Sequence, residues 1–429
     1  MGADGEEPHR IAEFDARDSI FSFAWGPGGQ RLVYVRFRGE FAKREQVIET
    51  CDLQGSRALV LASVPRSRSD GATEVWWLPD GRILYTLPDP LSYSDYDIWS
   101  VAADPLSGKP LGPPSRLTNG EGAASNFVAS ADGKRFIYMS TRSNDAVNVG
   151  NLDLRAEKFS PRRLTLDVWD NEPFGWTRDS KAVLFQSIRS GRSAILKQRI
   201  DQQTPEVLLS GAESYQQPTF SPAGDRFLYT ASATLDRHDP SERLESMLVA
   251  GGAPTILLAG DYTYHCGSVP SARCVLGDMK GRQFVFSILD PVKGKGVEIQ
   301  RAEVEVSAEW SLSPDGNKIA IINPLRGGNK VWLLTLADGT LVTLALQGGK
   351  WKYMQSVAWS ADGSHLFATA YTGTSFVILY IDLRSNQQVL AEVHQADAWL
   401  YHPVPSPDGH YLAYMKRTYE ENVMMLEHF

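Results

Sequence analysis

Apolar and polar positions alternate in short runs that recur along almost the whole chain. The clearest copy is SLSPDGNKIAI, Ser311 to Ile321, in which two apolar runs flank a Ser-Pro-Asp-Gly segment. Proline presets φ at the first turn position, aspartate bonds its own backbone, and glycine accepts a positive φ. Runs rich in β-branched and aromatic residues, bounded by Gly and Pro, indicate strands rather than helices. Each copy therefore predicts a β-hairpin.

The spacing of these turns gives the number of copies. The turn glycine, or the serine that replaces it, lies at Gly29, Gly81, Gly133, Ser180, Gly224, Gly316, Gly363 and Gly409. The successive gaps are 52, 52, 47, 44, 92, 47 and 46 residues, so the gap of 92 predicts a hidden copy near residue 270. The segment TYHCGSVPSARCVLGD, Thr263 to Asp278, has two apolar runs around Pro270 and fits that place. The chain therefore contains nine copies.

Each copy has room for four strands. In the eighth copy the apolar runs are Met354 to Trp359, Leu366 to Ala370, Phe376 to Leu383 and Gln388 to Val393. Four short strands in about 40–50 residues are what a propeller blade needs, because one small sheet buries both faces only when blades stack around a ring. The sequence predicts an all-β fold, a single β-propeller of four-stranded blades. Nine blades are favoured, or eight if the copy near residue 270 is irregular.

The two ends of the chain complete this expected ring. The last copy supplies only three strands before Phe429, so we expect the N-terminal run Ile11 to Phe14 to complete that blade. Closure of this kind removes the free edge of a sheet. The propeller would then span residues 11–429. Residues 1–10, MGADGEEPHR, are polar and are expected to be a linker or a cloning remnant.

The repeat resembles a known bacterial family. The SPDG turn, the aromatic residue before it and the apolar return strand are similar to TolB-type, or WD-like, propeller repeats. The third strands Asp97-Ile98-Trp99 and Lys330-Val331-Trp332 fit the same pattern, and the resemblance covers residues 15 to 429. DPVKGKG, Asp290 to Gly296, and the ending SPDGHYLAYMKRTYEENVMMLEHF resemble propellers that follow a bacterial Ser/Thr kinase or winged-helix regulatory domain. The resemblance implies a binding or sensor module.

Composition narrows the classes of partner. A chain of 429 residues ordinarily forms two or three domains, but in a repeat ring each layer between blades is its own core. The formal charge of −8 argues against a nucleic-acid or anionic-membrane surface, which would need a basic field. No apolar run approaches the ~18–20 residues of a membrane span. We expect a monomer, on the periplasmic or extracellular side if it belongs to a membrane-anchored sensor.

The cysteines leave alternatives open. Cys266 and Cys274 lie on the two strands of one predicted hairpin. They form a disulfide if the register places them opposite each other in an oxidising compartment, and otherwise they are two buried thiols. Zinc is a third alternative because His265 adjoins Cys266, but the site lacks a fourth ligand. We therefore expect no metal and no cofactor.

The tryptophans indicate one candidate surface. Trp25, Trp76, Trp77, Trp176, Trp310 and Trp359 precede the turns on first strands, and Trp99 and Trp332 lie on third strands, where we expect them to pack between blades. The other three tryptophans lie in connections that lead into first strands. In a propeller these connections gather at one mouth of the channel. The predicted ligand-binding residues there are Trp169, Asp170, Glu172, Tyr215, Tyr264, His265, Trp351, Tyr353, Trp399, Tyr401 and His402.

Exposed aromatic rings beside polar groups are suited to a small molecule, a glycan, a peptide or a protein loop. The alternative is that the rings only plug the channel. The sequence contains no G-x-S-x-G, H-E-x-x-H or G-x-x-x-x-G-K-[ST] motif, so we expect no enzyme. Two alternatives remain: a carbohydrate-active enzyme using Glu172 with Glu309 or Glu74, and a protein-interaction scaffold. The favoured hypothesis is a non-enzymatic sensor or binding module of a bacterial signalling or regulatory protein.

Overall fold

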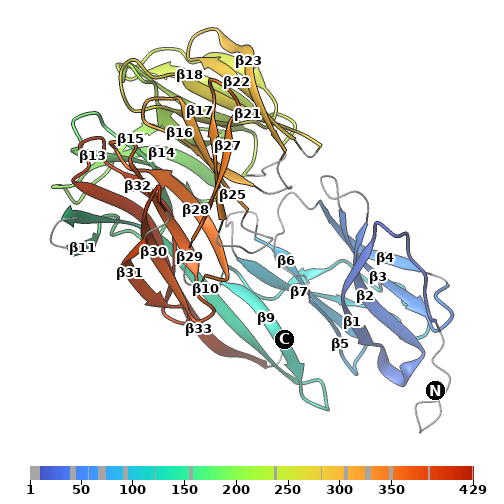
Figure 1. Cartoon of the computed structure of the whole chain (residues 1–429). Helices are drawn as coiled ribbons and strands as arrows, with labels where there is room; N and C mark the ends of the chain where they lie inside the picture. The colour runs from blue at the N-terminus through green and yellow to red at the C-terminus, as the bar shows by residue number, and fades with distance from the viewer. Residues whose placement is uncertain are drawn as a thin grey trace. The chain divides into compact units, whose positions relative to one another are not determined.

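The structure of the chain is a computed structural model, and its strands are shown in Figure 1. It describes residues 10–38, 45–56, 58–65, 74–89, 95–120, 122–153, 158–235, 239–281, 283–303, 308–323, 330–346, 351–384, 387–427 and 429. These residues form β-strands and one short 3-10 turn, η1 (Pro27–Gly29), with no α-helix among them. The chain divides into two compact units, Met1–Ser143 with Glu420–Phe429 (unit 1) and Asn144–Tyr419 (unit 2).

Unit 1 contains three sets of strands, which we call its first, second and third sheets. The second and third are joined by one parallel bridge between Tyr96 and Ala123 and belong to one nine-stranded sheet. The first is β1 (Ser19–Trp25), β2 (Arg31–Arg38), β3 (Glu45–Asp52) and β4 (Leu59–Pro65), and the second is β5 (Val75–Trp77), β6 (Arg82–Pro88), β7 (Tyr96–Ala102) and β8 (Ser115–Arg116). The third consists of β9 (Ala123–Ala129) with the first part of β10 (Arg135–Asp153) and the last part of β33 (Tyr411–Glu427). Arg135 on β10 and Glu427 on β33 form an exposed ion pair at 2.9 Å at this end.

Unit 2 contains five complete four-stranded sheets. The first two are β12 (Asp170–Trp176), β13 (Ala182–Arg189), β14 (Arg192–Arg199), β15 (Glu206–Leu209), and β16 (Ser214–Phe220), β17 (Arg226–Ser232), β18 (Arg243–Leu248), β19 (Thr255–Ala259). The third is β20 (Thr263–Cys266), β21 (Cys274–Lys280), β22 (Gln283–Asp290) and β23 (Gly294–Glu303). The last two are β24 (Glu309–Leu312), β25 (Lys318–Ile322), β26 (Lys330–Thr335), β27 (Leu341–Ala345), and β28 (Tyr353–Trp359), β29 (His365–Tyr371), β30 (Ser375–Asp382), β31 (Gln387–His394).

A sixth set of four strands joins the two ends of unit 2. It consists of β32 (Ala398–Pro405), the first part of β33, the last part of β10, and β11 (Lys158–Arg163). The backbone N–H of Leu152 donates to the carbonyl of His410 at 2.8 Å, so strands from the start and the end of the unit are paired. The first strands contact one another in the order β12, β16, β20, β24, β28, β32 and back to β12. Unit 2 therefore holds six sets of four strands in a cycle.

Tryptophans connect neighbouring first strands in this cycle. The indole N–H of Trp310 donates to Thr263 Oγ1 at 2.9 Å, and that of Trp359 donates to the Ser311 carbonyl at 3.1 Å. All three indole rings at this position, including Trp176, are at least 95% buried. Buried aromatic rings with a satisfied N–H combine a large apolar contact with a directional one. In these three sheets the tryptophan therefore helps to fix how the sheet lies on the preceding one.

The turn chemistry of the repeat is present in the structure. Gly316 has φ of 73°, and its N–H donates to the Ser313 carbonyl at 2.8 Å. Asp315 Oδ1 accepts from Ser313 Oγ at 2.6 Å and from the N–H of Asn317 at 3.1 Å. Because glycine adopts positive φ without a steric cost, this tight turn sets the register of the two strands. The sequence thus encodes each hairpin locally.

The predicted nine-blade count and the closure by the N-terminal run are not confirmed. Residues 11–14 form no strand, and the strand next to β33 is β10. β10 has 19 residues and β33 has 17, and each contributes to both units. Turn signals specify which strands form a hairpin, but they say nothing about the partner of a strand at a sheet edge. The degenerate copy near residue 270 forms the regular sheet β20 to β23.

Candidate functional site

The cycle of unit 2 joins at β12 and β32, where two predicted site residues meet. Glu172 Oε1 contacts His402 Nδ1, and Glu172 Oε2 accepts from Gln186 Nε2 at 2.7 Å. On the same pair of strands the indole N–H of Trp176 donates to the carbonyl of Val404 at 2.8 Å, across 228 residues of chain. Both oxygens of the Glu172 carboxylate are therefore engaged by partners on neighbouring strands.

Bulges in the first strands bring polar groups into this region. The register shifts in β16 and in β32, where Gln217 and His402 adopt positive φ of 53° and 48°. A bulge leaves a backbone N–H outside the ladder and re-aims the side chain. The N–H of His402 donates to Ser356 Oγ and that of Gln217 to Gln186 Oε1, each at 3.1 Å. Side chains on a neighbouring sheet thus satisfy both groups.

Hydrogen bonds extend from this pair around much of the cycle. The hydroxyl of Tyr264 donates to the carbonyl of Gln217 at 2.6 Å, and burial raises the pKa of that hydroxyl well above its usual value. The connected groups are Ser356, His402, Glu172, Gln186, Gln217 and Tyr264, from β28, β32, β12, β13, β16 and β20. We name these six residues the polar network. It connects five of the six first strands.

Trp399 and Tyr401 lie in an aromatic cluster. Their ring centroids are 6.0 Å apart, and the Phe376 ring is 5.0 Å from Trp399. Tyr353 joins the cluster through Tyr371, whose ring lies 5.2 Å away. Trp399 is partly buried among apolar neighbours, so it contributes to packing as well as to any surface. The ligand-binding role of these residues stays a prediction.

Two other predicted residues make packing contacts. The indole N–H of Trp351 donates to Gln387 Oε1 at 2.8 Å, and its ring packs on the core between β24–β27 and β28–β31. Tyr215 packs edge-on against Tyr229 with 5.8 Å between ring centroids. The sequence correctly placed Trp351 and Tyr215 at the entry to a first strand, but it did not show where their side chains point. We therefore leave both outside the candidate site.

An apolar loop precedes β12 and was missed by the sequence reasoning except at its last residue. We define the apolar loop as residues 165–169. Leu166, Val168 and Trp169 expose 60%, 82% and 37% of their surface. Its sequence, Thr-Leu-Asp-Val-Trp, contains three large apolar residues in a connection that would ordinarily be polar. These three apolar residues were the signal by which the sequence could have revealed the apolar loop.

Polar contacts hold the apolar loop in place. Asn171 Nδ2 donates to Asp167 Oδ1 and to the Trp169 carbonyl, both at 2.7 Å. Arg163 Nη2 donates to the Asp167 carbonyl at 2.8 Å, and Arg189 Nη2 pairs with Asp167 Oδ2 at 3.1 Å. The backbone is thus fixed at its middle and its end while its apolar side chains face solvent.

Asp170 bonds the backbone next to an ion pair. Its Oδ1 accepts from the backbone N–H of Asp145 at 3.1 Å. The Asp145 carboxylate in turn accepts from Nε and Nη2 of Arg417, both at 2.6 Å. Burial lowers the pKa of Arg417 and the Asp145 carboxylate raises it, with a net increase. The pair ties β33 to β10 beside the start of β12.

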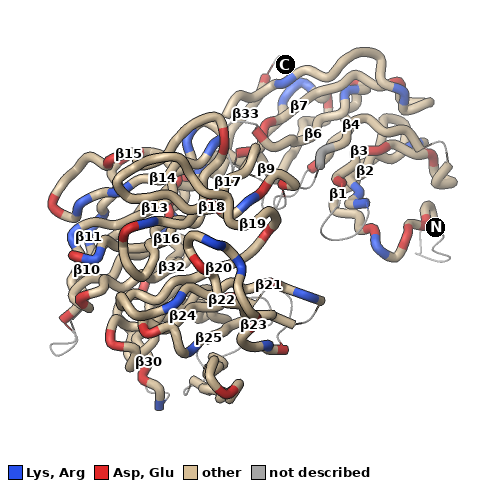
Figure 2. Tube along the Cα trace, turned by 90° about the horizontal axis from the view of Figure 1, so that it is seen from above, with Lys and Arg blue, Asp and Glu red and all other residues tan. Residues whose placement is uncertain are grey.

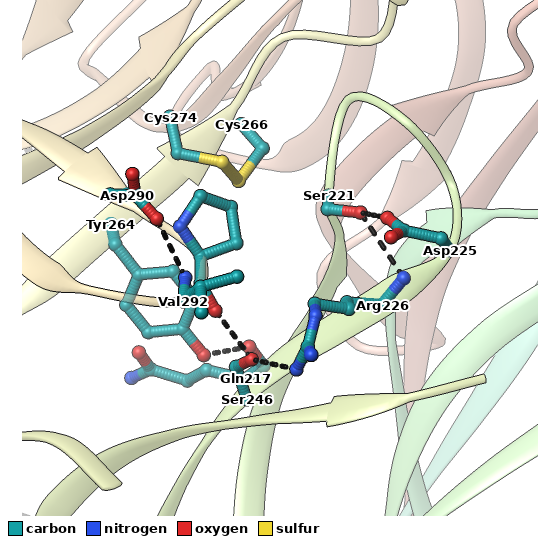
Figure 3. Close-up of a disulfide and its surroundings, with 11 residues drawn as sticks. Gln217, Ser221, Asp225, Arg226, Ser246, Tyr264, Cys266, Cys274, Asp290 and Val292 are labelled. Carbon is teal, nitrogen blue, oxygen red and sulfur yellow. Dashed lines mark hydrogen bonds between the residues drawn. A yellow bond between two sulfur atoms is a disulfide. The ribbon is translucent and has the colours of Figure 1, made fainter. Parts of the chain in front are cut away.

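The degenerate copy carries a disulfide between Cys266 and Cys274, which are directly opposite each other on β20 and β21. Figure 3 shows it near Tyr264, whose hydroxyl reaches Gln217. His265 packs edge-on against Trp310 with 4.4 Å between ring centroids, and burial lowers the pKa of His265 to about 4. The His265 ring therefore makes a packing contact between β20 and β24.

His265 makes stability depend on pH. Its folded-state pKa of about 4 lies below the ordinary value, so below about pH 6.5 the unfolded chain binds a proton that the folded chain does not. Acidification from pH 7 to 4.5 is expected to remove about 2 kcal/mol through this residue alone. Urea unfolding of His265→Phe should show a correspondingly smaller loss. The exposed control His394→Gln should keep the wild-type pH dependence, and equal losses in all three proteins would contradict the assignment.

The carboxylates proposed for a glycosidase have structural partners. In unit 1, Glu74 accepts from the backbone N–H of Asn126 at 3.1 Å and of Phe127 at 3.4 Å, at the bulge of β9. Glu172 is engaged as described above, and Glu309 lies exposed at the start of β24. No observation on these three residues favours an acid and base pair.

A surface hollow of about 430 Å³ lies beside β14 and β15 in unit 2. It is lined by Thr177, Arg178, Asp179, Lys181, Ala182, Lys197, Arg199, Gln202, Thr204 and Glu206. Arg199 pairs with Asp201 and Lys197 with Glu206, each at 2.8 Å, so half of its cations are neutralised. Positive and negative residues are interspersed along the trace (Figure 2). We therefore do not assign an anion site here.

Among the residues that the structure describes, no group of three or more His, Cys, Asp or Glu side chains is arranged to hold a metal ion. Within the same residues, no helix is long and apolar enough to cross a bilayer.

No family model and no curated protein matches the chain. Among solved structures it is similar to a protein assigned as TolB from Agrobacterium tumefaciens, with 15% identity, 65% of this chain and 99% of that chain covered, and a TM-score of 0.47. TolB from Acinetobacter baumannii is 17% identical, with 91% of this chain and 80% of that chain covered and a TM-score of 0.42. A chain of a nidogen/laminin complex is 12% identical, with 58% of this chain and 94% of that chain covered and a TM-score of 0.43. The fold assignment therefore rests on the strand pairing of this chain itself.

Proposed function

We propose that the chain is a non-enzymatic binding module, and that unit 2 holds a peptide segment of a protein partner at the apolar loop and the adjacent Glu172–His402 pair. The observation that carries the proposal is the apolar loop, whose three large apolar side chains are exposed while its backbone is fixed by hydrogen bonds. Clustered exposed apolar side chains mark interaction sites in soluble proteins. The proposal narrows the set of ligands expected at the channel mouth to a peptide.

The physical argument rests on preorganisation. A loop already fixed in one conformation loses little entropy on binding, so more of the contact energy appears as affinity. Trp169 and its apolar neighbours can anchor a partner side chain, as aromatic residues do at binding hot spots. Glu172 lies three residues after Trp169 on β12, and its contact with His402 on β32 places polar groups beside the apolar loop. Small ligands, in contrast, are usually enclosed in concave pockets.

The broader role follows the resemblance noted in the sequence. As part of the proposal, the module serves as the sensing part of a bacterial regulatory protein. The Cys266–Cys274 disulfide favours an oxidising compartment such as the periplasm, because cytosolic thiols are kept reduced. The partner would then meet the module outside the cytoplasm.

The proposal predicts an affinity loss specific to the apolar loop. Peptides selected by phage display against the purified chain are titrated by calorimetry against the wild type, Trp169→Ala and Val168→Asp. We expect the two substitutions to weaken binding at least tenfold, about 1.4 kcal/mol or more, because they remove the anchors. Val207→Asp, an exposed valine on β15, is the matched control and should bind as the wild type does. Unchanged affinity in both loop variants contradicts the proposal.

A further inference from the structure

The three sheets of unit 1 form a stack with an open apolar face at its first strand. Phe21, Phe23 and Trp25 on β1 expose between 54% and 71% of their surface. Phe and Trp rings each present roughly 150–250 Å², so these three offer a patch on the order of 300–400 Å². That is the size of the largest patch on a typical soluble monomer. The sequence had indicated that Trp25 packs between blades, and the structure shows that it is exposed.

Equivalent tryptophans in unit 2 show what normally covers the position of Trp25. The Trp25 position corresponds to Trp176, Trp310 and Trp359, whose indole N–H groups each donate to the preceding first strand. In unit 1 the ring of Trp77 lies on the backbone of β1, since a Cβ at Gly26 would be 2.9 Å from its Cε3 atom. Within the described part of unit 1, Trp25 has no preceding sheet. Trp25 therefore lacks the contact that its counterparts make, which is with the first strand of a preceding sheet.

The other end of the stack is also apolar. On the third sheet Phe136, Tyr138, Met424 and Leu426 pack toward the second sheet. Alternation places the intervening residues on the opposite face. These are Val128, Ile137, Val423 and Met425, which expose between 40% and 77% of their surface. Val128 and Ile137 are direct partners across β9 and β10. Unit 1 thus has one open apolar face at each end.

We propose that two copies of this chain pair through unit 1, with the β1 face of each copy against the third sheet of the other. Three sheets from each copy make six, the number whose first strands form a cycle in unit 2. A two-fold axis repeats the same contact twice, so both open faces of both copies are covered. Each copy contributes two apolar faces of comparable area, which together approach the roughly 800 Å² per partner of a stable interface. The dimer replaces the monomer expected from the sequence.

Sedimentation equilibrium of the full chain between 1 and 50 μM tests the pairing. We expect twice the mass of one chain for the wild type. Phe23→Asp and Val423→Asp, one on each face, should each give a single-chain mass. Leu106→Asp and Val207→Asp, at exposed positions that belong to neither face, should remain dimeric. A single-chain mass for the wild type overturns the proposal.

A mixing experiment separates lost pairing from misfolding. In a mixed dimer of the Phe23→Asp and Val423→Asp chains, one contact carries both substitutions and the other carries neither. Because each face meets the opposite face, mixing should restore a two-chain species that neither variant forms alone. Failure of the mixture to associate, while both variants keep the wild-type circular dichroism spectrum, would also overturn the proposal.

Discussion

Arg417→Met is expected to lower the free energy of unfolding of unit 2 by about 3 kcal/mol or more, because it leaves a buried carboxylate without its partner. The side chain of Asp145 is only 8% exposed, and both of its oxygens accept from Arg417 at 2.6 Å. Methionine preserves most of the aliphatic packing, so the loss reports the charge rather than a cavity. The measurement is urea unfolding followed by far-ultraviolet circular dichroism.

The chain contains a matched control for this substitution. Arg199 and Asp201 form the same bidentate pair, at 2.9 and 2.8 Å, but Asp201 is 61% exposed. An exposed pair contributes about 0–1 kcal/mol, so Arg199→Met should unfold close to the wild type. Equal losses for Arg417→Met and Arg199→Met would show that the pairing of β33 with β10 does not hold unit 2 together.

Trp176→Ala is expected to lower the free energy of unfolding by about 3–5 kcal/mol, the usual cost of truncating a buried large aromatic residue. Trp176 is 5% exposed, stacks on Tyr411 with 5.9 Å between ring centroids, and donates to the carbonyl of Val404. These contacts are made where β12 meets the last sheet of unit 2. The substitution therefore weakens the closure of the cycle.

Two variants separate packing from hydrogen bonding at this position. Trp176→Phe keeps a ring but removes the N–H, and should cost less than the alanine variant does. Trp169→Ala, at the exposed tryptophan of the apolar loop, should change stability by about 0.5 kcal/mol or less. If Trp176→Ala unfolded with the wild-type midpoint, β12 and β32 would not meet as the structure shows.

The hairpins of this fold are readable in the sequence because their determinants are local. The runs expected at Met354 to Trp359 and Leu366 to Ala370 correspond to β28 and β29 with shifts of one residue. The spacing also located the degenerate copy, where Cys266 and Cys274 face each other. Turn residues and alternation act over a few positions, so each copy reports its own structure.

The pairing of distant strands is not encoded in the same way. β10 and β33 continue beyond the length of an ordinary strand and take part in both units. Nothing in the turn signature distinguishes a strand that pairs with the next hairpin from one that pairs almost 300 residues away. The number of repeats therefore did not give the organisation of the chain into two units.

The candidate site was partly predictable for a topological reason. Connections that lead into first strands recur at one position in the repeat, which singled out Glu172 and His402, and the structure brings their side chains into contact. Side-chain direction cannot be read from that position, so Trp351 was placed in the same set although its partly buried ring packs against the core. Val168 was overlooked because single apolar residues in connections are common.

Photo-crosslinking tests the proposed binding site most directly. A selected peptide that carries a benzophenone side chain is irradiated with the wild-type chain, and the attachment points are located by mass spectrometry. The account predicts crosslinks within residues 165–172 and at 399–402, which disappear when unlabelled peptide is added in excess. Crosslinks that remain confined to β15, β19 or the sheets of unit 1 would contradict it.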